Sequence, residues 1–385
     1  MITTAKQIRI AQSCASEPRQ AVAELHAGMA QEEMALVVFF CSSSYDRETL
    51  AEEMNRQFPG VQVVGCTTAG EIGPLGYREG SLVGASFPAA TCTAVSGHLG
   101  HLQQFEIKQG LVLAQALLGQ LESAAPTVGT DNTFAFLLID GLSQREEPVA
   151  HALQNALGDI SLFGGSAGDD LHLERTWVFH DGAFHGDSAV LLLITTELPF
   201  RIFKTQHFVS ESERLVVTAA DASRRLVKEI NCLPAAEEYA RIVGTTVGEL
   251  DPASFAARPV VVAIDGTDYV RSIQKANPDG SLTFYCAIEE GLVLRVVRGV
   301  DLLGNLHETF AELRSEIGPL QFVFACDCIL RNLEVTQAGV KDAVAQIFRD
   351  NNAIGFSTYG EQFHGVHVNQ TLSGIAIGKA EAADA

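Results

Sequence analysis

Leu36-Val-Val-Phe-Phe-Cys41 is an uninterrupted apolar run, typical of a buried strand. A polar turn at Ser42–Asp46 and an amphipathic segment at Glu48–Phe58 follow it, and the next apolar run ends in Gly65-Cys-Thr-Thr-Ala-Gly-Glu71. A helix that joins two apolar strands predicts parallel pairing, with the helix packed on one face of the sheet. The stretch therefore predicts a strand–helix–strand unit that closes on glycine, hydroxyl and acidic residues.

The same order occurs twice more along the chain. Each further copy has an apolar strand, a helix and a glycine-containing closing segment: Phe134–Ile139, Val149–Leu157 and Gly164–Asp170, then Phe322–Cys326, Val340–Arg349 and Gly355–Glu361. A single closing segment is explained by an ordinary turn, because Gly, Ser and Asp are common at strand ends. Three copies in the same context predict a shared architectural unit, though not a shared active site.

Further strands and one hairpin are expected between the copies. Alternating or apolar runs predict strands at Ser81–Phe87, Ala189–Thr195, Leu215–Thr218, Val260–Ile264 and Leu292–Val297. Asp181-Gly182 between Arg175–Phe179 and Phe184-His185 predicts a tight hairpin. We expect an α+β fold with mixed β-sheets covered by helices, in two domains at 30–222 and 223–378.

Composition excludes several classes of function. The 385 residues include 26 basic and 47 acidic side chains, a formal net charge of -21. This charge argues against binding to nucleic acid or to an anionic membrane, since both need clustered Lys and Arg. The N-terminus lacks the pattern of a signal peptide, no apolar run approaches membrane-spanning length, and the eight cysteines are sparse. We therefore expect a cytoplasmic protein with reduced cysteines.

Motifs of catalysis and metal binding are weak. The sequence has no P-loop, no dinucleotide fingerprint and no nucleophile elbow, so we expect no enzyme. Cys66 is a conceivable nucleophile, but a buried structural thiol is the commoner role. His98 and His101 have a helical spacing, yet Gly97 and Gly100 predict a loop there.

One histidine has surroundings that are compatible with a cofactor. His207 lies in Thr205-Gln-His-Phe-Val209, between the apolar run Phe200–Phe203 and a predicted strand. An imidazole among apolar residues is a potential axial ligand of haem, which needs a neutral ring in an apolar pocket. A half-buried, hydrogen-bonded histidine near a strand end explains the same pattern.

The closing segments together resemble the FIST family of bacterial and archaeal sensory proteins. The resemblance rests on Gly65–Ile72, Gly164–Asp170, Ala235–Arg241 and Gly355–Glu361, and it extends over roughly residues 30 to 378. It implies a FIST N-type domain at 30–222 and a FIST C-type domain at 223–378. Both would serve sensory ligand binding.

A narrower resemblance is to the NosP-type branch of this family. It rests on Thr205–Phe208, Glu229–Asn231 and Val366–Gly374. It implies haem b as cofactor, nitric oxide as ligand, and signalling to a separate histidine kinase or cyclic-di-GMP enzyme. His207 is the first candidate for the haem iron and His367 the second. Cys326 and Cys328 are weaker candidates, because a thiolate needs an electropositive pocket.

The alternative interpretation is a sensory module for a small metabolite, such as an amino acid, without haem. Hydroxyl and amide groups for such a ligand occur at Thr67, Thr68, Ser166, Ser357 and Asn369. Arg331 would pair with the ligand's carboxylate. An ion pair between Arg331 and one of the many acidic side chains is the competing interpretation. Assembly as a homodimer is left open.

Overall fold

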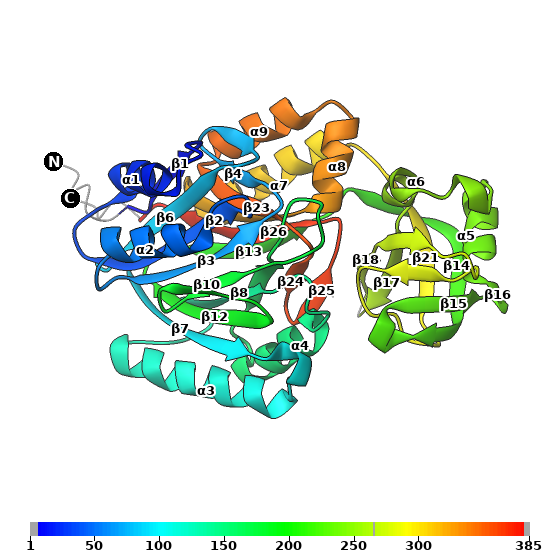
Figure 1. The fold of residues 1–385 in the computed structure, drawn as a ribbon, viewed down its shortest axis with the longest axis horizontal. Helices are drawn as coiled ribbons and strands as arrows, with labels where there is room; N and C mark the ends of the chain where they lie inside the picture. Colours follow the sequence, from blue (N-terminus) through cyan, green and yellow to red (C-terminus); the bar gives the residue numbers. More distant parts are fainter. Residues whose placement is uncertain (1–6, 265, 381–385) are drawn as a thin grey trace.

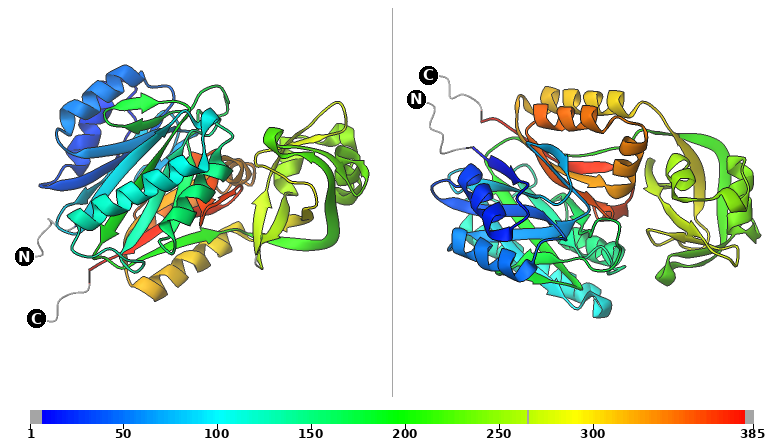
Figure 2. Two further views of the ribbon diagram at one scale, coloured as in Figure 1. Left: turned by 90° about the horizontal axis from the view of Figure 1, so that it is seen from below. Right: turned by 45° about the horizontal axis from the view of Figure 1, so that its top comes forward.

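The computed structural model describes residues 7–264 and 266–380. The described residues form a body with three six-stranded sheets and a smaller lobe, residues 208–299, with an eight-stranded sheet. Figure 1 shows the lobe standing beside the body, and both views in Figure 2 show the same separation. No helix in the described ranges is long and apolar enough to cross a membrane.

The three sheets of the body have the same strand order. The first contains β1 (Arg9–Ser13), β6 (Leu82–Pro88), β2 (Met34–Ser42), β3 (Gln62–Thr68), β10 (Val178–His180) and β11 (Ala183–His185). The second contains β7 (Cys92–Gly100), β12 (Ser188–Thr196), β8 (Thr133–Ile139), β9 (Leu162–Ser166), β24 (Glu361–Phe363) and β25 (Val366–Val368). The third contains β13 (Phe200–Thr205), β26 (Leu372–Gly378), β22 (Leu320–Cys328), β23 (Ala353–Thr358), β4 (Glu71–Gly73) and β5 (Gly76–Arg78).

Helices connect these strands in the same way in each unit. The edge strand leads to a helix that precedes the first parallel strand: α1 (Pro18–Met29), α3 (Ile107–Ala124) or α7 (Leu302–Ile317). The crossover between the two parallel strands contains α2 (Arg47–Gln57), α4 (Glu146–Leu157), or α8 (Ile329–Gln337) with α9 (Lys341–Asp350). The pairs β2–β3, β8–β9 and β22–β23 are parallel, so the three predicted strand–helix–strand units are confirmed.

Each unit contributes a hairpin to a neighbouring sheet. The hairpin β4–β5 of the first unit pairs with β23 of the third. The hairpin β10–β11 of the second pairs with β3 of the first, and β24–β25 of the third pairs with β9 of the second. This cyclic exchange ties the three units together. The predicted Asp181-Gly182 turn is confirmed, with φ of 47° and 76°.

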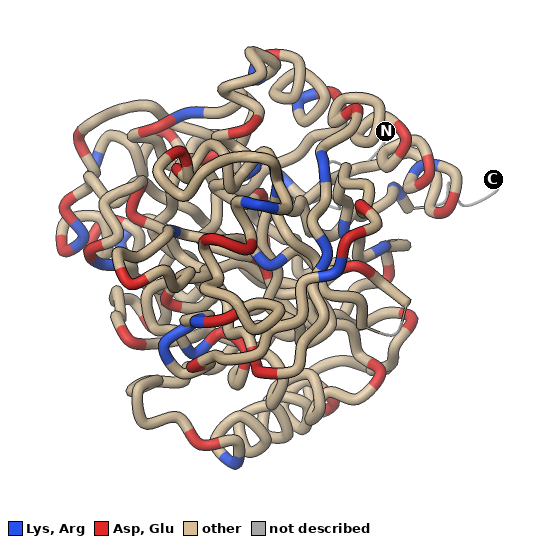
Figure 3. The backbone as a smooth tube through the Cα atoms, turned by 90° about the vertical axis from the view of Figure 1, so that its right-hand side faces the viewer, with Lys and Arg blue, Asp and Glu red and all other residues tan. Residues whose placement is uncertain are grey.

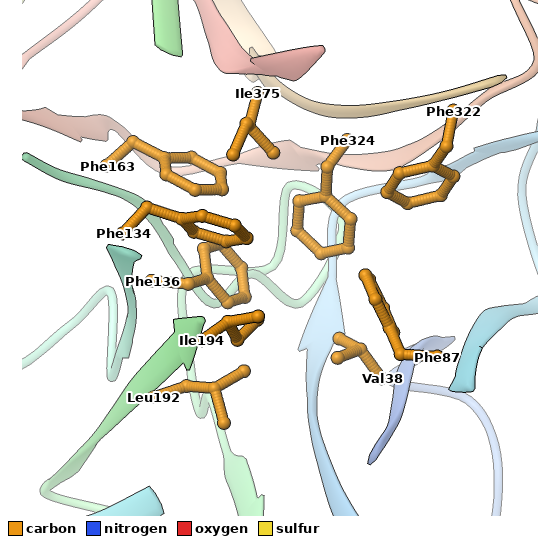
Figure 4. A pocket seen from close by; sticks show the side chains of 10 residues that line it. All are labelled: Val38, Phe87, Phe134, Phe136, Phe163, Leu192, Ile194, Phe322, Phe324 and Ile375. Atoms are coloured by element: carbon orange, nitrogen blue, oxygen red, sulfur yellow. The ribbon is translucent and has the colours of Figure 1, made fainter. Parts of the chain in front are cut away.

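The inner faces of the three sheets share one apolar core. Figure 4 shows how aromatic side chains from different sheets meet there, among them Phe87, Phe136 and Phe324. The space left between them is only about 10 Å³, roughly what one water molecule needs. The centre of the body is therefore closely packed and is not a ligand cavity.

The lobe is inserted between β13 and α7 of the third unit. Its strands, in sheet order, are β18 (Thr267–Arg271), β17 (Val260–Ile264), β21 (Val293–Gly299), β14 (Phe208–Asp221), β15 (Leu226–Ile230), β20 (Leu282–Phe284) and β19 (Ile273–Ala276), and β16 (Leu233–Pro234) pairs with β15. Helices α5 (Ala235–Val243) and α6 (Pro252–Ala257) accompany it. The position 222/223, predicted as a domain boundary, lies between β14 and β15.

One local prediction is wrong. Gly97 and Gly100 do not form a loop but belong to β7. Gly97 faces α3, where a Cβ would lie 2.6 Å from Cδ1 of Leu113, so the glycine allows close helix–sheet packing. The segment around His364 and Gly365 is the turn of hairpin β24–β25.

Candidate functional site

The carboxyl ends of β3, β9 and β23 meet at one place in the body. Thr67, Ser166 and Ser357 occupy equivalent positions there, and all three are completely buried. The residue two positions after each hydroxyl donates its N–H to the next unit: Ala69 N to Ser357 O (3.0 Å), Gly168 N to Thr67 O (3.0 Å) and Tyr359 N to Ser166 O (3.2 Å). The structure thus brings together three of the residues predicted to bind a metabolite.

The three hydroxyl groups already have protein partners. Oγ1 of Thr67 accepts from the N–H of Trp177 at 3.1 Å. Ser166 Oγ accepts from Nε2 of Gln362, and Ser357 Oγ accepts from Nδ2 of Asn332, each at 2.9 Å. The contacts of Thr67 and Ser166 join different units, whereas Asn332 of α8 and Ser357 both belong to the third unit. Because each hydroxyl oxygen already has a protein partner, these side chains have a structural role and are not free to bind a ligand.

Two other predicted residues are engaged in local pairs. Thr68 donates its hydroxyl hydrogen bond to Glu71. Arg331 of α8 pairs with Asp327, near the end of β22, with 2.7 Å between Nη1 and Oδ1, and both side chains are buried. The competing interpretation of Arg331 as an ion-pair partner therefore describes its place in the structure.

A cluster of unpaired amide and imidazole atoms lies next to Ser166. Within the described part of the chain, Oε1 of Gln362, Nε2 of His367 and both polar atoms of Asn369 have no hydrogen-bond partner. Gln362 and Asn369 are completely buried and His367 is 1% exposed. His367 and Asn369 face Gly360, where a Cβ would lie 2.8 Å from Nε2 of His367 and 2.9 Å from Nδ2 of Asn369, and Nε2 of Gln362 is 3.3 Å from Nδ1 of His367. We call Gln362, His367 and Asn369 the amide cluster.

Leaving these atoms unpaired is energetically unfavourable. A buried polar group without a partner costs about 1–3 kcal/mol, because it has lost water and gained nothing. Burial also lowers the pKa of His367 to about 4, so the imidazole is neutral at pH 7. A neutral imidazole and amides offer both donors and acceptors to a small polar molecule.

A pocket of about 90 Å³ opens on the other side of Tyr359, between the body and the lobe. The body supplies Gly141, Leu142, Gln144, Leu173 and Tyr359, and the lobe supplies Arg224, Arg225, Gln274, Thr283, Phe284 and Tyr285. Tyr359, which lines the pocket, directly precedes Gly360, the glycine that faces His367 and Asn369. A cavity of about 150 Å³ holds a molecule the size of benzene, so this pocket encloses a smaller molecule or one end of a larger one.

An ion-pair cluster holds the lobe to the body beside this pocket. Nη2 of Arg225 lies 2.6 Å from Oε2 of Glu146 and 2.9 Å from Oε2 of Glu147, both on α4. Oε1 of Glu147 accepts from the N–H of Ala287 in the lobe at 2.7 Å. Burial raises the pKa of Glu146 above its ordinary range, while the Arg225 guanidinium opposes that rise. We call Arg225, Glu146 and Glu147 the latch.

Two protein-family patterns match successive parts of this sequence. The sequence pattern of the FIST N domain matches residues 35–232, and that of the FIST C domain matches residues 235–364. The chain belongs to the FIST family. FIST domains are sensory domains of signalling proteins, so the resemblance at the level of the family is confirmed.

Comparison with individual proteins adds no activity to this FIST protein. No curated protein sequence matches it significantly. Two solved structures of cyanuric acid hydrolase, one from A. caulinodans, align with 97% of this chain and 99% of theirs. Their TM-scores are 0.40 and 0.38 and their identities 11% and 8%, values too low to support an argument about function.

The histidines proposed as haem ligands do not fit that role in this FIST protein. Nε2 of His207 is 2.7 Å from Oε1 of Glu334, and the ring is 2% exposed at the neck where the chain enters the lobe. His367 has a free Nε2, as an axial ligand requires, but amides and the Gly360 backbone crowd it. Haem needs a flat apolar space beside the ligating atom.

The cysteines singled out from the sequence are also poorly placed for chemistry. Cys66, Cys326 and Cys328 are buried, and burial raises the pKa of each thiol well above its usual range. The thiolate form that a nucleophile or a haem ligand needs is therefore disfavoured.

Several residues of the site were missed by the sequence analysis. Gln362 and Tyr359 belong to the third unit but contact Ser166 and Asp169 of the second. The latch joins residues almost 80 positions apart. No local sequence pattern predicts contacts between residues so far apart in the chain. An Arg-Arg dipeptide at 224–225 in an acidic chain was the one available signal.

Proposed function

We propose that this FIST protein senses a small polar metabolite, such as an amino acid, at the junction of the body and the lobe. The observation that supports the proposal is Asn369, a completely buried carboxamide with neither end paired. A molecule that enters through the pocket and hydrogen-bonds to Asn369 would remove this penalty. It gains the same benefit at His367 and Gln362.

The pocket suggests the chemistry of the ligand. Its size suits a molecule smaller than benzene, or one end of a larger molecule that extends out of the pocket. Arg224 is exposed at the pocket and offers a guanidinium to a carboxylate, while Phe284 and Tyr285 offer apolar surface. A small amino acid combines these features.

Binding would reach the lobe through Tyr359. This side chain lines the pocket and directly precedes Gly360, and it belongs to the same apolar cluster as Tyr285 of the lobe. A ligand that pairs with Asn369 displaces Tyr359 and changes how the lobe is held by the latch. We propose that this movement is passed to a separate histidine kinase or cyclic-di-GMP enzyme.

The test measures thermal stability of the full chain with each common amino acid, followed by calorimetric titration of any that stabilises it. Asn369→Ala should abolish the response while leaving the unliganded protein equally stable or up to about 1 kcal/mol more stable, because it removes an unpaired group. Asn351→Ala is the matched control. Asn351 is also buried, but its Oδ1 accepts from Arg314 and its Nδ2 donates to Ile347 O at 2.7 Å.

The control should show the opposite pattern. Asn351→Ala should lose about 2–3 kcal/mol of stability and keep the ligand response. If no amino acid or related small metabolite stabilises the wild type, or if Asn369→Ala responds normally, the proposed site is wrong.

The haem-dependent nitric oxide function stays a prediction of the family resemblance, and the same protein tests it. Haem is titrated into the full chain, and the Soret band is followed with and without nitric oxide in wild type, His207→Ala and His367→Ala. Because neither imidazole has space for a macrocycle, we expect no stoichiometric uptake. One haem per chain, with a spectrum altered in either variant, would establish the haem function instead.

A further inference from the structure

The outer face of the lobe sheet carries two arginines directly opposite one another. Arg214 of β14 pairs in register with Arg295 of β21. In an antiparallel sheet, residues in register point to the same face, and like charges in this arrangement are destabilising. No ion pair joins either arginine to an acidic side chain among the residues described. Among the residues that the structure describes, no carboxylate within ion-pair distance offsets the repulsion of this pair.

Exposed apolar side chains lie beside these arginines on the same face. Val216 is opposite Val293 in the next row, and these valines are 37% and 43% exposed. The neighbouring strand β17 adds Ala263, which is also exposed. The alternate residues Leu215 and Leu294 point the other way, into the lobe core. We call Arg214, Arg295, Val216, Val293 and Ala263 the arginine–valine face.

We propose that the arginine–valine face is a docking surface for an acidic segment of a partner protein that also carries apolar side chains. Carboxylates would pair with the two guanidinium groups, and apolar side chains would cover the valines. The proposal concerns a surface away from the ligand pocket and does not depend on which ligand the protein senses.

The charge distribution favours a protein over other partners. Residues 208–299 hold 10 basic and 13 acidic side chains, so the lobe contributes only -3 to the net charge of -21. Figure 3, which looks onto the lobe side, shows basic and acidic positions interspersed there. Two arginines on such a background are too few for nucleic acid, and the strongly acidic body would be repelled by an anionic membrane.

The binding test uses a labelled twelve-residue peptide of alternating Glu and Val, added to the full chain and followed by fluorescence anisotropy. Peptides of alternating Lys and Val, and of Glu and Ser, separate charge from apolar contact. We expect only the Glu–Val peptide to bind well, with affinity that falls as salt is raised. Arg214→Glu or Arg295→Glu should weaken binding at least tenfold.

Arg298→Glu is the matched control, because Arg298 is an exposed arginine of β21 that points to the opposite face from Arg295. It should change binding less than twofold. Absence of binding to the wild type, or an equal loss in Arg298→Glu, would overturn the proposal.

Stability supplies a second readout that does not need a ligand. Arg214→Glu replaces a like-charge pair by an opposite-charge pair and should raise Tm by about 1–3 °C, while Arg298→Glu should not. If Arg214→Glu and Arg295→Glu both lower Tm, the arginines are structural and the proposal fails. Sedimentation is measured in parallel, and a dimer that these two reversals dissociate would assign the face to a second copy of the chain instead.

Discussion

The first and third units of the body end in the same buried carboxyl arrangement, but their surroundings differ. Glu71 accepts from Thr68 and from both N and Oγ of Ser81, while Glu361 accepts from Thr358 and from Thr371 at 2.6 Å. Both carboxyl groups are completely buried. A shared arrangement with shared partners indicates an architectural role, since it closes the hairpin that leaves each unit.

The difference lies around the glycine that precedes each carboxyl group. Near Gly70 the side chain of Asn332 donates to Ser357, and one of its atoms, Oδ1, is unpaired. Gly360 faces the amide cluster, where four atoms are unpaired. The repeated features thus hold the fold, and the feature found in one unit alone marks the candidate site. Three further pairs of substitutions test this distinction.

The largest difference is expected between Gly360→Ala and Gly70→Ala. Both glycines have positive φ, 145° and 122°, so alanine strains the backbone at either position. At Gly360 the new Cβ would also collide with the ring of His367, whereas at Gly70 the nearest atom is 3.5 Å away. We expect losses of roughly 3–6 and 1–3 kcal/mol, measured by urea unfolding. Equal losses would mean that the space around Gly360 is not restricted.

The two carboxyl groups should differ in how they make stability depend on pH. Burial raises the pKa of Glu361 to about 8 and that of Glu71 to about 7, from an ordinary 4.5. The folded state therefore keeps a proton that the unfolded state releases, and stability falls as pH rises from about 4.5 through these values.

Glu361→Gln should remove roughly 2–4 kcal/mol of this pH dependence between pH 5 and 8, and Glu71→Gln roughly 1–3 kcal/mol. Unfolding curves at pH 5, 6, 7 and 8 measure both. A wild type whose stability is constant or rises over this range would show that the carboxyl groups are ionised.

The smallest difference concerns the buried hydroxyl groups of Ser357 and Ser166. Ser357→Ala leaves the carboxamide of Asn332 without its partner and should cost about 1–2 kcal/mol. Ser166→Ala should cost only about 0.5–1 kcal/mol, because Nε2 of Gln362 keeps a contact with Nδ1 of His367 at 3.3 Å. Thermal unfolding of the two variants in one buffer checks the order, and the reverse order would contradict the proposed pairing.

The sequence predicted those features of the fold that depend on residues close together along the chain. Leu36–Cys41 and its two counterparts form parallel strands because each is apolar on both faces and is followed by an amphipathic helix. The exchange of hairpins was not predictable, because Glu71 and Phe356 are paired by the tertiary fold and not by local pattern. Gly97 shows the converse error, since a glycine selected for packing against Leu113 was interpreted as a loop.

The residues of the candidate site, too, were only partly predictable from the sequence. Thr67, Ser166 and Ser357 could be identified because they repeat in similar context. Their meeting point, however, depends on all three units. The pairing of His207 with Glu334 was invisible, since 127 positions separate them. The amide cluster could be named only in part, because no residue type signals that its polar atoms lack partners.

The hairpin exchange also has a consequence for synthesis of the chain. The strand β4 pairs with β23 through Ile72 and Gly355, so the first hairpin leaves the ribosome long before its partner exists. At about 5–20 residues per second, the wait is roughly 15–60 s. During this interval the third sheet cannot form, and the apolar inner faces of the first two sheets stay uncovered. We expect the nascent chain to depend on chaperones until its last strands are made.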